Sequence, residues 1–323
     1  MLAIQAVRTG GPEVLEAVEL PIPEPGPGQI RIRHEAIGLN FIDTYLRSGL
    51  YPVKLPAVLG QEGAGVVDAI GEGVTRFKRG DRAAYGTGPM GAYAAFHVVA
   101  EARAVHLPDA VSTEIATGAM LKGMTAEFLL RRCYPVKSGD AVLIHAAAGG
   151  VGGILVQWAK ALGALVIGTV GSADKAAVAR DHGCDHVIEY RHEDIAARAR
   201  EITGGQGVRV IYDGVGAATF EASLASLGRR GMLVSFGNAS GPAPAIEPGR
   251  LQRGGSLFLT RPTLFDYVAS NAELDASAAA LFAVIASGAV KIEIGQRFAL
   301  ADARRAHEAL EARETIGASL LIP

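Results

Sequence analysis

Apolar and polar positions follow two different patterns along the chain, and the change falls near residue 120. Before it, short alternating apolar stretches are broken by Gly and Pro: Pro21–Gly28 holds four prolines and Gly60–Gly73 holds five glycines. Short apolar stretches separated by Gly and Pro predict a barrel-like β meander. From about residue 139, apolar strands alternate with helical segments, and this pattern predicts βαβ units.

The second pattern predicts a six-stranded, doubly wound parallel sheet, because six apolar runs precede Pro262, where the alternation stops. In the helix from Val151, apolar residues recur at offsets of three, four, seven and eleven, so this face packs against the sheet and is core, not a cofactor site. We expect strands at 141–144, 165–167, 187–188, 208–212, 232–236 and 256–260, helices from 151 and near 175–181, and, after Pro262, helices at 273–287 and 301–313 and an apolar end at 318–323.

The composition predicts a two-domain protein, because 323 residues exceed the usual size of one hydrophobic core. The 31 basic and 33 acidic side chains leave a net charge of −2, so the charge balance does not suggest a basic surface for binding nucleic acid. No apolar run approaches the about eighteen residues that span a bilayer, and residues 1–8 read as a strand, so we expect a cytoplasmic protein without a membrane partner. Cys133 and Cys184 are too few for a disulfide framework and fit a reducing compartment.

A glycine-rich loop at residues 146–152 follows a predicted strand and opens a predicted helix, the context in which such a loop binds a dinucleotide. Glycine allows close approach to a pyrophosphate, and the first amides of the helix donate to its oxygens. Ala147 replaces the first glycine of the G-x-G-x-x-G form, so we expect a less strained turn there. The alternative is that Gly149, Gly150 and Gly152 only form a tight turn between strand and helix.

The residues after the next strand favour NADPH over NADH. A carboxylate about twenty residues beyond the loop usually binds the ribose 2′-hydroxyl of NAD, whereas a 2′-phosphate requires neutral or cationic donors. Here Gly171, Ser172 and Lys175 occupy that place, and Asp174 falls in the first turn of the next helix, where acids are common as caps. A reading in which Asp174 is the missing acid, with NAD as cofactor, remains the alternative.

With these motifs placed, the chain resembles the quinone oxidoreductase (zeta-crystallin-like) branch of the medium-chain dehydrogenase/reductase superfamily over essentially its whole length. The resemblance is carried by residues 10–15, 38–45, 49–52, 145–152 and 235–238. It implies an α/β fold in which a Rossmann-type doubly wound parallel sheet is inserted in a GroES-like β-barrel domain. The expected domains are 1–122 with 263–323 (GroES-like, catalytic) and 123–262 (Rossmann, NADPH-binding). It also implies a homodimer paired through the outermost strand, 256–260, which is apolar and uncharged.

Zinc dehydrogenases of the same superfamily carry a cysteine and a Gly-His-Glu triplet where this chain has Asn40 and Gly60-Gln61-Glu62. No cysteine precedes Cys133, so the N/S ligands of a tetrahedral zinc site are missing and we expect no metal. His182 and His186 are four positions apart, but a glycine lies between them and they lead into a strand. We interpret them as surface residues.

The resemblance implies contacts with NADPH on both sides of a cleft. Where the family often has Tyr, this chain has Phe128, which keeps a stacking face and loses a hydroxyl. The implied contacts are Asn40, Phe41, Asp43, Thr44, Tyr45, Thr125, Phe128, Gly149, Gly150, Val151, Gly152, Gly171, Ser172, Lys175, Tyr190, Val215, Phe236, Gly237, Asn238, Ser240, Pro262, Thr263, Leu264 and Arg313, of which Ser172, Lys175, Tyr190 and Arg313 would form the 2′-phosphate pocket.

The function implied is zinc-free transfer of reducing equivalents from NADPH to quinones, in which positioning matters more than acid–base chemistry. Asn40, Tyr45 and Tyr51 are the candidate catalytic residues around the acceptor, although both tyrosines could equally be packing residues. One alternative is reduction of an activated C=C bond in an enone, which needs a placed proton donor. Another is a crystallin-like structural or RNA-binding role, against which the near-neutral charge argues.

Overall fold

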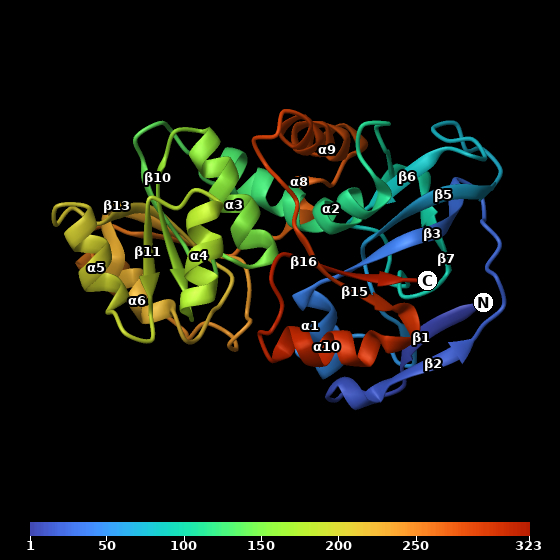
Figure 1. The fold of residues 1–323 in the computed structure, drawn as a ribbon, viewed down its shortest axis with the longest axis horizontal. Coiled ribbons are helices and arrows are strands. Elements are labelled where there is room, and N and C mark those ends of the chain that lie inside the picture. The colour runs from blue at the N-terminus through green and yellow to red at the C-terminus, as the bar shows by residue number, and fades with distance from the viewer. The chain divides into compact units, whose positions relative to one another are not determined.

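The computed structural model describes residues 1–323, and the chain divides into two compact units. Unit 1 comprises Met1–Met124, Val268–Ala286 and Ile292–Pro323, and unit 2 comprises Thr125–Tyr267 and Ser287–Lys291. These limits differ from the domain ranges expected from the sequence at residues 123–124, 263–267 and 287–291. The assignment of a catalytic and an NADPH-binding domain stays a prediction. Both termini lie in unit 1 (Figure 1).

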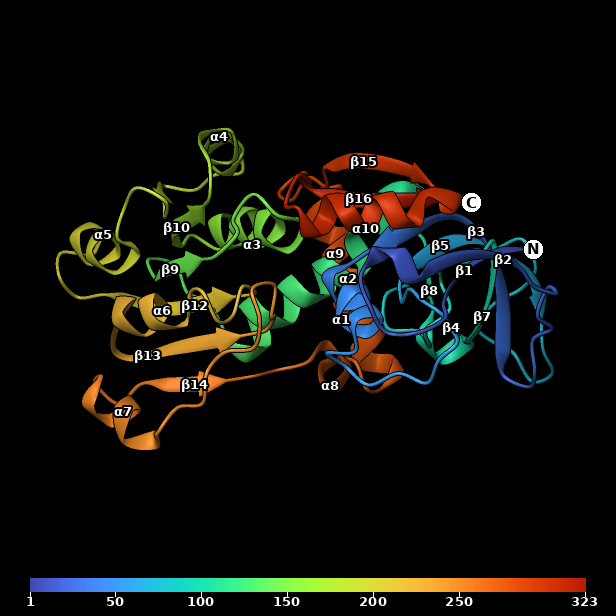
Figure 2. The same ribbon diagram turned by 90° about the horizontal axis from the view of Figure 1, so that it is seen from below.

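Unit 2 contains the six-stranded sheet that the sequence predicts. All its neighbouring strands are parallel, and their order is β11-β10-β9-β12-β13-β14, so the order reverses between β9 and β12. Figure 2 shows β10, β9, β12, β13 and β14 in this order across the sheet. The strands are β9 (Ala141–Ile144), β10 (Leu165–Val170), β11 (His186–Glu189), β12 (Val208–Asp213), β13 (Leu227–Ser235) and β14 (Phe258–Thr260).

The helices of unit 2 follow these strands and cover the sheet. Leu143, Ile167, Ile211 and Leu233 are paired side by side across four strands, and all are fully inaccessible, so they form the centre of the core. The helices are α3 (Gly150–Ala161), α4 (Ala173–Asp181), α5 (Ile195–Ile202), α6 (Phe220–Ser226), α7 (Pro248–Arg253) and α8 (Leu264–Tyr267), with a π-helix, η3, at Leu129–Cys133.

Two strands of unit 2 begin two or more residues away from the expected start, for local reasons. β14 begins at Phe258 instead of Ser256, because Ser256 adopts a left-handed φ of 58° and the Leu257 amide bonds to Leu251 O. β13 begins five residues before the expected start, at Leu227, where the register against β12 is irregular. The polar Arg229 and Arg230 in this segment masked its strand character.

Unit 1 is built on a seven-stranded sheet of order β15-β16-β3-β5-β6-β8, with β7 paired to β3, and on a three-stranded sheet of order β2-β1-β4. The β-rich first part of the chain that the sequence predicts is thereby confirmed. Its strands are β1 (Leu2–Ala6), β2 (Leu15–Glu19), β3 (Gln29–Leu39), β4 (Ala57–Val58), β5 (Gly63–Ile70), β6 (Arg82–Tyr85), β7 (Phe96–Ala100), β8 (Val105–His106), β15 (Ile294–Ala299) and β16 (Ala318–Ile322).

Helices border these sheets, and α1 lies beside α10 in both views (Figures 1 and 2). The helices are α1 (Phe41–Ser48), α2 (Thr113–Phe128, which runs on into unit 2), α9 (Asn271–Ala286) and α10 (Ala303–Glu311), with 3-10 turns η1 (Pro12–Val14), η2 (Glu101–Arg103) and η4 (Leu300–Asp302). The expected helix 301–313 is therefore a 3-10 turn followed by a shorter α-helix.

Candidate functional site

The glycine-rich loop of unit 2 joins the carboxyl end of β9 to the amino end of α3. Gly149 is the N-cap of α3 and has no side chain to bond the first amides of the helix, so these amides remain available to an anion. A β-carbon on Gly152 would lie 2.1 Å from Ala146 O, so only glycine allows the helix to approach the loop this closely. The left-handed residue of the turn is Ala146, with φ 51°, and not Ala147, where the sequence suggested the irregularity.

The residues expected around a 2′-phosphate lie together in unit 2, with one exception. Ser172 is the N-cap of α4 and Lys175 lies in its first turn, as does Asp174, which supports the capping interpretation of that acid. Tyr190 follows β11, and a β-carbon on Gly171 would lie 2.5 Å from its hydroxyl, so the ring tip covers this glycine. The exception is Arg313, which belongs to unit 1.

The turns after β12 and β13 pack on each other and bring together another expected group. Ser240 donates to Val215 O from both its amide and its hydroxyl, each at 2.8 Å. A β-carbon on Gly237 would lie 2.3 Å from Gly214 O, so the two turns are in close backbone contact. Phe236 lies against Gly214, at 2.9 Å from the position of a β-carbon there. Asn238 lies between these residues in the second turn.

A buried polar network beneath these turns was not found by sequence reasoning. Asp213 is 1% exposed, and its carboxylate accepts hydrogen bonds from the amides of Val215 (2.8 Å) and Gly216 (3.0 Å), so it fixes the turn after β12. Ser223 donates to the same carboxylate at 3.1 Å and also contacts His145 Nε2 at 2.9 Å. The only sequence signal was an acid that ends an apolar strand.

His145 links this network to the glycine-rich loop, which begins at the next residue. Its Nδ1 lies 2.8 Å from Thr169 Oγ1 on β10. Burial lowers the pKa of His145, and the charge of Asp213 opposes that effect. The hydroxyl hydrogen of Ser223 is donated to Asp213, so the Ser223 oxygen must accept from His145 Nε2. The neutral imidazole therefore carries its proton on Nε2, and its Nδ1 accepts from the Thr169 hydroxyl. The network therefore ties together the carboxyl ends of β9, β10 and β12, where the strand order reverses and ligands of such sheets bind.

The remaining expected cofactor residues of unit 2 lie at the end of α2 and between β14 and the start of α8. Phe128 is 1% exposed and its ring stacks on Tyr267 with centroids 4.4 Å apart, so the ring packs inside unit 2. Thr125 lies one turn earlier on the same helix. Pro262, Thr263 and Leu264 connect β14 to α8.

In unit 1, the candidate catalytic residues lie on and directly after α1. Asn40 is its N-cap, and Phe41, Asp43, Thr44 and Tyr45 lie on the helix. The rings of Tyr45 and Tyr51 meet edge to face at 5.4 Å, and the Tyr51 amide donates to Tyr45 O at 3.1 Å. The structure therefore brings Asn40, Tyr45 and Tyr51 into one segment.

A buried ion pair lies behind Asn40, where zinc dehydrogenases have metal ligands. Glu62 is fully inaccessible, and its Oε2 accepts from Asn40 Nδ2 at 2.8 Å and from Lys122 Nζ at 3.3 Å. Its Oε1 accepts from the Leu121 amide at 2.7 Å. Because Glu62 only accepts, it fixes the orientation of the Asn40 amide, with Nδ2 toward the carboxylate.

These residues do not fit a metal ion. The Glu62 carboxylate is occupied by an ammonium group, an amide side chain and a backbone N–H, and no sulfur or imidazole ligand stands beside it. No group of three or more His, Cys, Asp or Glu side chains suited to a metal occurs in residues 1–323. We therefore derive no step through a metal ion.

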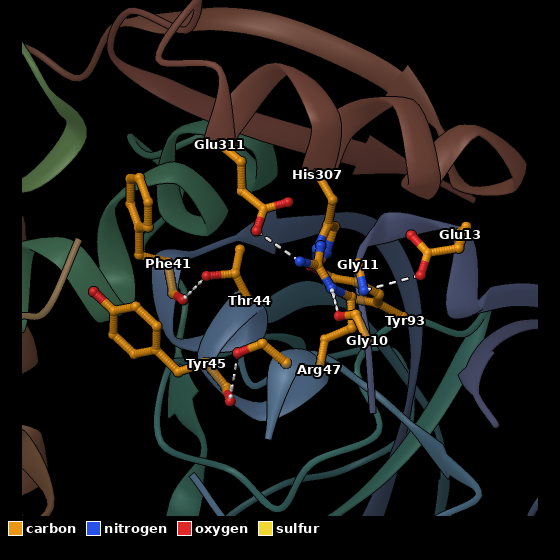
Figure 3. A network of polar contacts seen from close by, with 11 residues as sticks. Gly10, Gly11, Glu13, Phe41, Thr44, Tyr45, Arg47, Tyr93, His307 and Glu311 are labelled. Atoms are coloured by element: carbon orange, nitrogen blue, oxygen red, sulfur yellow. Dashed lines mark hydrogen bonds and ion pairs between the residues drawn. The ribbon is translucent and has the colours of Figure 1, made fainter. Parts of the chain in front are cut away.

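A second buried network holds the opposite face of α1, and Figure 3 shows its members Arg47, Tyr93 and His307. Asp43 Oδ2 accepts from the Asn40 amide (2.9 Å) and from Tyr93 Oη (2.9 Å). The Tyr93 hydroxyl also lies 3.0 Å from His307 Nε2, and His307 Nδ1 lies 3.0 Å from Arg47 Nη1. Burial raises the pKa of Asp43 to about 7, against the bonds from Asn40 and Tyr93, which lower it. The Asp43 carboxylate is thus enclosed, and its hydrogen bonds are made with protein groups, the Asn40 amide and the Tyr93 hydroxyl.

Family models and relatives match this chain along its length. Residues 26–109 match the alcohol dehydrogenase GroES-like domain, and residues 150–283 match the zinc-binding dehydrogenase family. A quinone oxidoreductase of Pseudomonas aeruginosa is 54% identical, with 99% of each chain covered. A 2-haloacrylate reductase of a Burkholderia species is 43% identical, with 98% of this chain and 97% of the relative covered. The crystal structure of the Escherichia coli quinone oxidoreductase complexed with NADPH is 50% identical, covers both chains completely and superposes with a TM-score of 0.98.

Proposed function

We propose that this chain, which belongs to the quinone oxidoreductase branch of the medium-chain dehydrogenase/reductase superfamily, is an enzyme that reduces quinones with NADPH. The observation that carries the proposal is the glycine-rich loop of unit 2, where the first amides of α3 are available to an anion, together with Ser172 and Lys175 at the start of α4, whose one acid, Asp174, lies in the first helical turn. Full-length relatives named quinone oxidoreductases, one of them with NADPH in its structure, support both the activity and the cofactor.

The proposed cofactor residues divide by the part of NADPH that their chemistry suits. Amides at 149–152 suit the pyrophosphate, and the group Gly171, Ser172, Lys175 and Tyr190 suits the 2′-phosphate, because it offers hydroxyls and a cation without a carboxylate. The turns at 215 and 236–240 and the segment 262–264 suit the nicotinamide side. The proposed set is completed by Thr125, Phe128, Arg313 and the α1 residues Phe41, Asp43, Thr44 and Tyr45. Asp43 contributes indirectly, because its carboxylate accepts from the Asn40 backbone amide and fixes the N-cap.

In the proposed reaction, NADPH, a proton and a quinone give NADP⁺ and a hydroquinone. The bound cofactor supplies the hydride, and the protein positions the two reactants. Asn40, Tyr45 and Tyr51 bind the acceptor, whose oxygen gains charge during the transfer. With one Asn40 N–H held by Glu62, the other is the donor that this amide offers to the acceptor oxygen.

The test measures oxidation of NADPH and NADH against a panel of quinones and enones, after elemental analysis for zinc. We expect NADPH and quinones to be preferred. Tyr45→Phe and Tyr51→Phe, singly and together, should lower quinone turnover while the protein stays folded; unchanged turnover would remove the catalytic role of both. A strong preference for NADH would contradict the cofactor assignment.

Two alternatives receive less support. Reduction of an activated C=C bond is not favoured, because the relatives of higher identity are named quinone oxidoreductases. A single turnover with a simple enone in deuterated solvent would detect the protonated carbon that this chemistry requires. For the crystallin-like structural or RNA-binding role, the near-neutral charge gives no support for binding RNA.

We also infer a homodimer formed through β14. Phe258 is 52% exposed on this three-residue strand at the open edge of the sheet, and an exposed apolar edge favours pairing with another strand. Sedimentation at micromolar concentration should give a dimer, and a stable monomer would contradict the inference. No helix is long and apolar enough to cross a membrane. Both cysteines are free, and we propose a cytoplasmic location.

A further inference from the structure

The opposite faces of α1 have different surroundings, and this difference suggests how the helix is held. Phe41 and Tyr45 project from one side of α1, whereas Arg47 points to the other, toward Tyr93 and His307 (Figure 3). Asp43 and Arg47 are four positions apart, the spacing at which opposite charges on a helix usually pair directly. Here Asp43 bonds to Tyr93 and Arg47 bonds to His307, so two residues from outside the helix complete the link.

The charge of Arg47 sets the direction of every hydrogen bond in this link. A guanidinium is always protonated and only donates, so His307 Nδ1, 3.0 Å away, must accept. His307 is then neutral, with its proton on Nε2, and donates to Tyr93 Oη at 3.0 Å. The single hydrogen of the Tyr93 hydroxyl is left for Asp43 Oδ2, 2.9 Å away. Each group in the link therefore donates to the next one: Arg47 to His307, His307 to Tyr93, and Tyr93 to Asp43.

The electrostatics and burial of these groups agree with that direction. Asp43, Tyr93 and His307 are completely inaccessible, and Arg47 is 1% exposed. Burial, reinforced by the charge of Arg47, lowers the pKa of His307 to about 3, so the ring stays neutral. Arg47 also donates to Gly10 O (3.1 Å) and to Glu311 (2.6 Å), which balances its charge.

The middle of the link is rigidly anchored. Tyr93 O accepts from the Ile4 amide of β1, and the Tyr93 amide donates to Leu59 O, both at 2.8 Å. His307 lies on the buried stripe of α10 together with Ala303, Ala306 and Leu310. The Tyr93 hydroxyl, which His307 contacts from the other side, thus faces the same oxygen of Asp43, Oδ2, that accepts from the backbone amide of Asn40.

We propose that Tyr93 and His307 are positioning residues that hold the first turn of α1, with Asn40 and Tyr45, in the geometry that receives the acceptor. The proposal rests on the proposed quinone reductase activity. Neither residue touches the acceptor; they act through Asp43, whose bond to the Asn40 amide fixes the N-cap. The charged groups that act on Asp43 are Lys122 and Glu62 from behind the N-cap, and Arg47 on the same helix acts on its partner Tyr93.

The variants separate hydrogen-bond direction from packing. Tyr93→Phe removes one oxygen and leaves the ring. His307→Leu removes both the acceptor and the donor, whereas His307→Gln keeps an acceptor for Arg47 and a donor for Tyr93. Glu308→Gln, on the exposed side of α10 where Glu308 pairs with Arg304, is the matched control. For each, kcat and KM for a simple quinone are measured with NADPH from pH 5.5 to 9, beside the thermal midpoint.

The expected pattern has three parts. Tyr93→Phe and His307→Leu lower kcat/KM at pH 7 by about tenfold, because a hydrogen bond to a charged group is lost. The pH profile of Tyr93→Phe moves to higher pH, because Asp43 loses a donor that favours its ionised form, whereas His307→Leu keeps the Tyr93 donor and shifts less. His307→Gln stays close to the wild type, and Glu308→Gln equals it.

Two results would overturn the proposal: folded Tyr93→Phe protein with wild-type kcat/KM and pH profile, or His307→Gln as impaired as His307→Leu. A thermal midpoint that falls while both kinetic readouts stay unchanged would show packing alone and would also overturn it. If His307→Leu does not fold, Tyr93→Phe and His307→Gln decide. If the wild type lacks quinone activity, the proposed function fails by itself, and amide hydrogen exchange in α1 tests the link: it should be faster in Tyr93→Phe and unchanged in Glu308→Gln.

Discussion

Lys122→Met removes the ammonium group from the buried pair with Glu62 and should destabilise unit 1 by about 3 kcal/mol. The Lys122 side chain is 8% exposed and that of Glu62 is fully inaccessible, so water cannot replace the lost partner. Removing one member of a buried pair costs about 3–5 kcal/mol, because the other charge stays unpaired. The bonds from the Leu121 amide and Asn40 Nδ2 to the carboxylate remain, which places the expected loss at the lower end.

The double variant Glu62→Gln with Lys122→Met tests whether the charge is the cause. Both charges are then absent, and the expected loss is only about 1–2 kcal/mol, since one N–H of the new amide faces another donor. Lys160→Met is the control: it breaks a pair with Asp185 in which both side chains are about one third exposed, and surface pairs contribute only about 0–1 kcal/mol.

Urea unfolding provides the assay, with two signals that distinguish the units. The single tryptophan, Trp158, lies on α3 in unit 2, so its fluorescence follows that unit, whereas far-ultraviolet circular dichroism follows both. The reasoning is refuted if Lys122→Met costs no more than Lys160→Met, or if the double variant is no more stable than the single one.

Three further changes test the cofactor loop, the cofactor preference and a buried histidine. Gly152→Ala should weaken NADPH binding at least about tenfold in calorimetric titration, because its β-carbon meets Ala146 O at 2.1 Å and the loop must shift. Ser172→Asp should shift the ratio of kcat/KM from NADPH toward NADH, because a carboxylate repels the 2′-phosphate. Burial lowers the pKa of His34 from 6.5 to about 3, so folded-state stability is lost as the pH falls below 6.5; His34→Gln should remove about 2–3 kcal/mol of that loss at pH 4.5 in urea titrations.

The sheet of unit 2 could be predicted because its information is local. Each strand is an apolar run, and the glycine-rich loop lies directly between a strand and a helix, so neighbours in sequence are neighbours in space. The errors arose where backbone conformation overrode composition. Ser256 is polar but was counted into an apolar strand that its left-handed φ excludes, and Arg229 and Arg230 hid the start of β13.

The supports of the site could not be predicted, because they join distant parts of the chain. Tyr93 and His307 are 214 positions apart and belong to no shared motif. In the sequence, Glu62 is marked only by the Gly-Gln-Glu triplet that stands where a metal motif would be, and Lys122, 60 positions away on α2, belongs to no motif. A buried polar residue gives no periodic signal, and its role follows only from the groups that the fold places against it.

These supports show how the proposed acceptor site would be oriented without a metal ion. A zinc ion would fix its ligands through coordination, whereas here Glu62 fixes the Asn40 side chain and Asp43 fixes the Asn40 backbone amide. Each carboxylate is completely buried and so is costly to desolvate. In return the geometry is determined, because the donors that the fold places around Glu62 and around Oδ2 of Asp43 hold the N-cap of α1 in one arrangement. We therefore expect substitutions at these carboxylates to alter the acceptor kinetics of the folded enzyme as well as its stability.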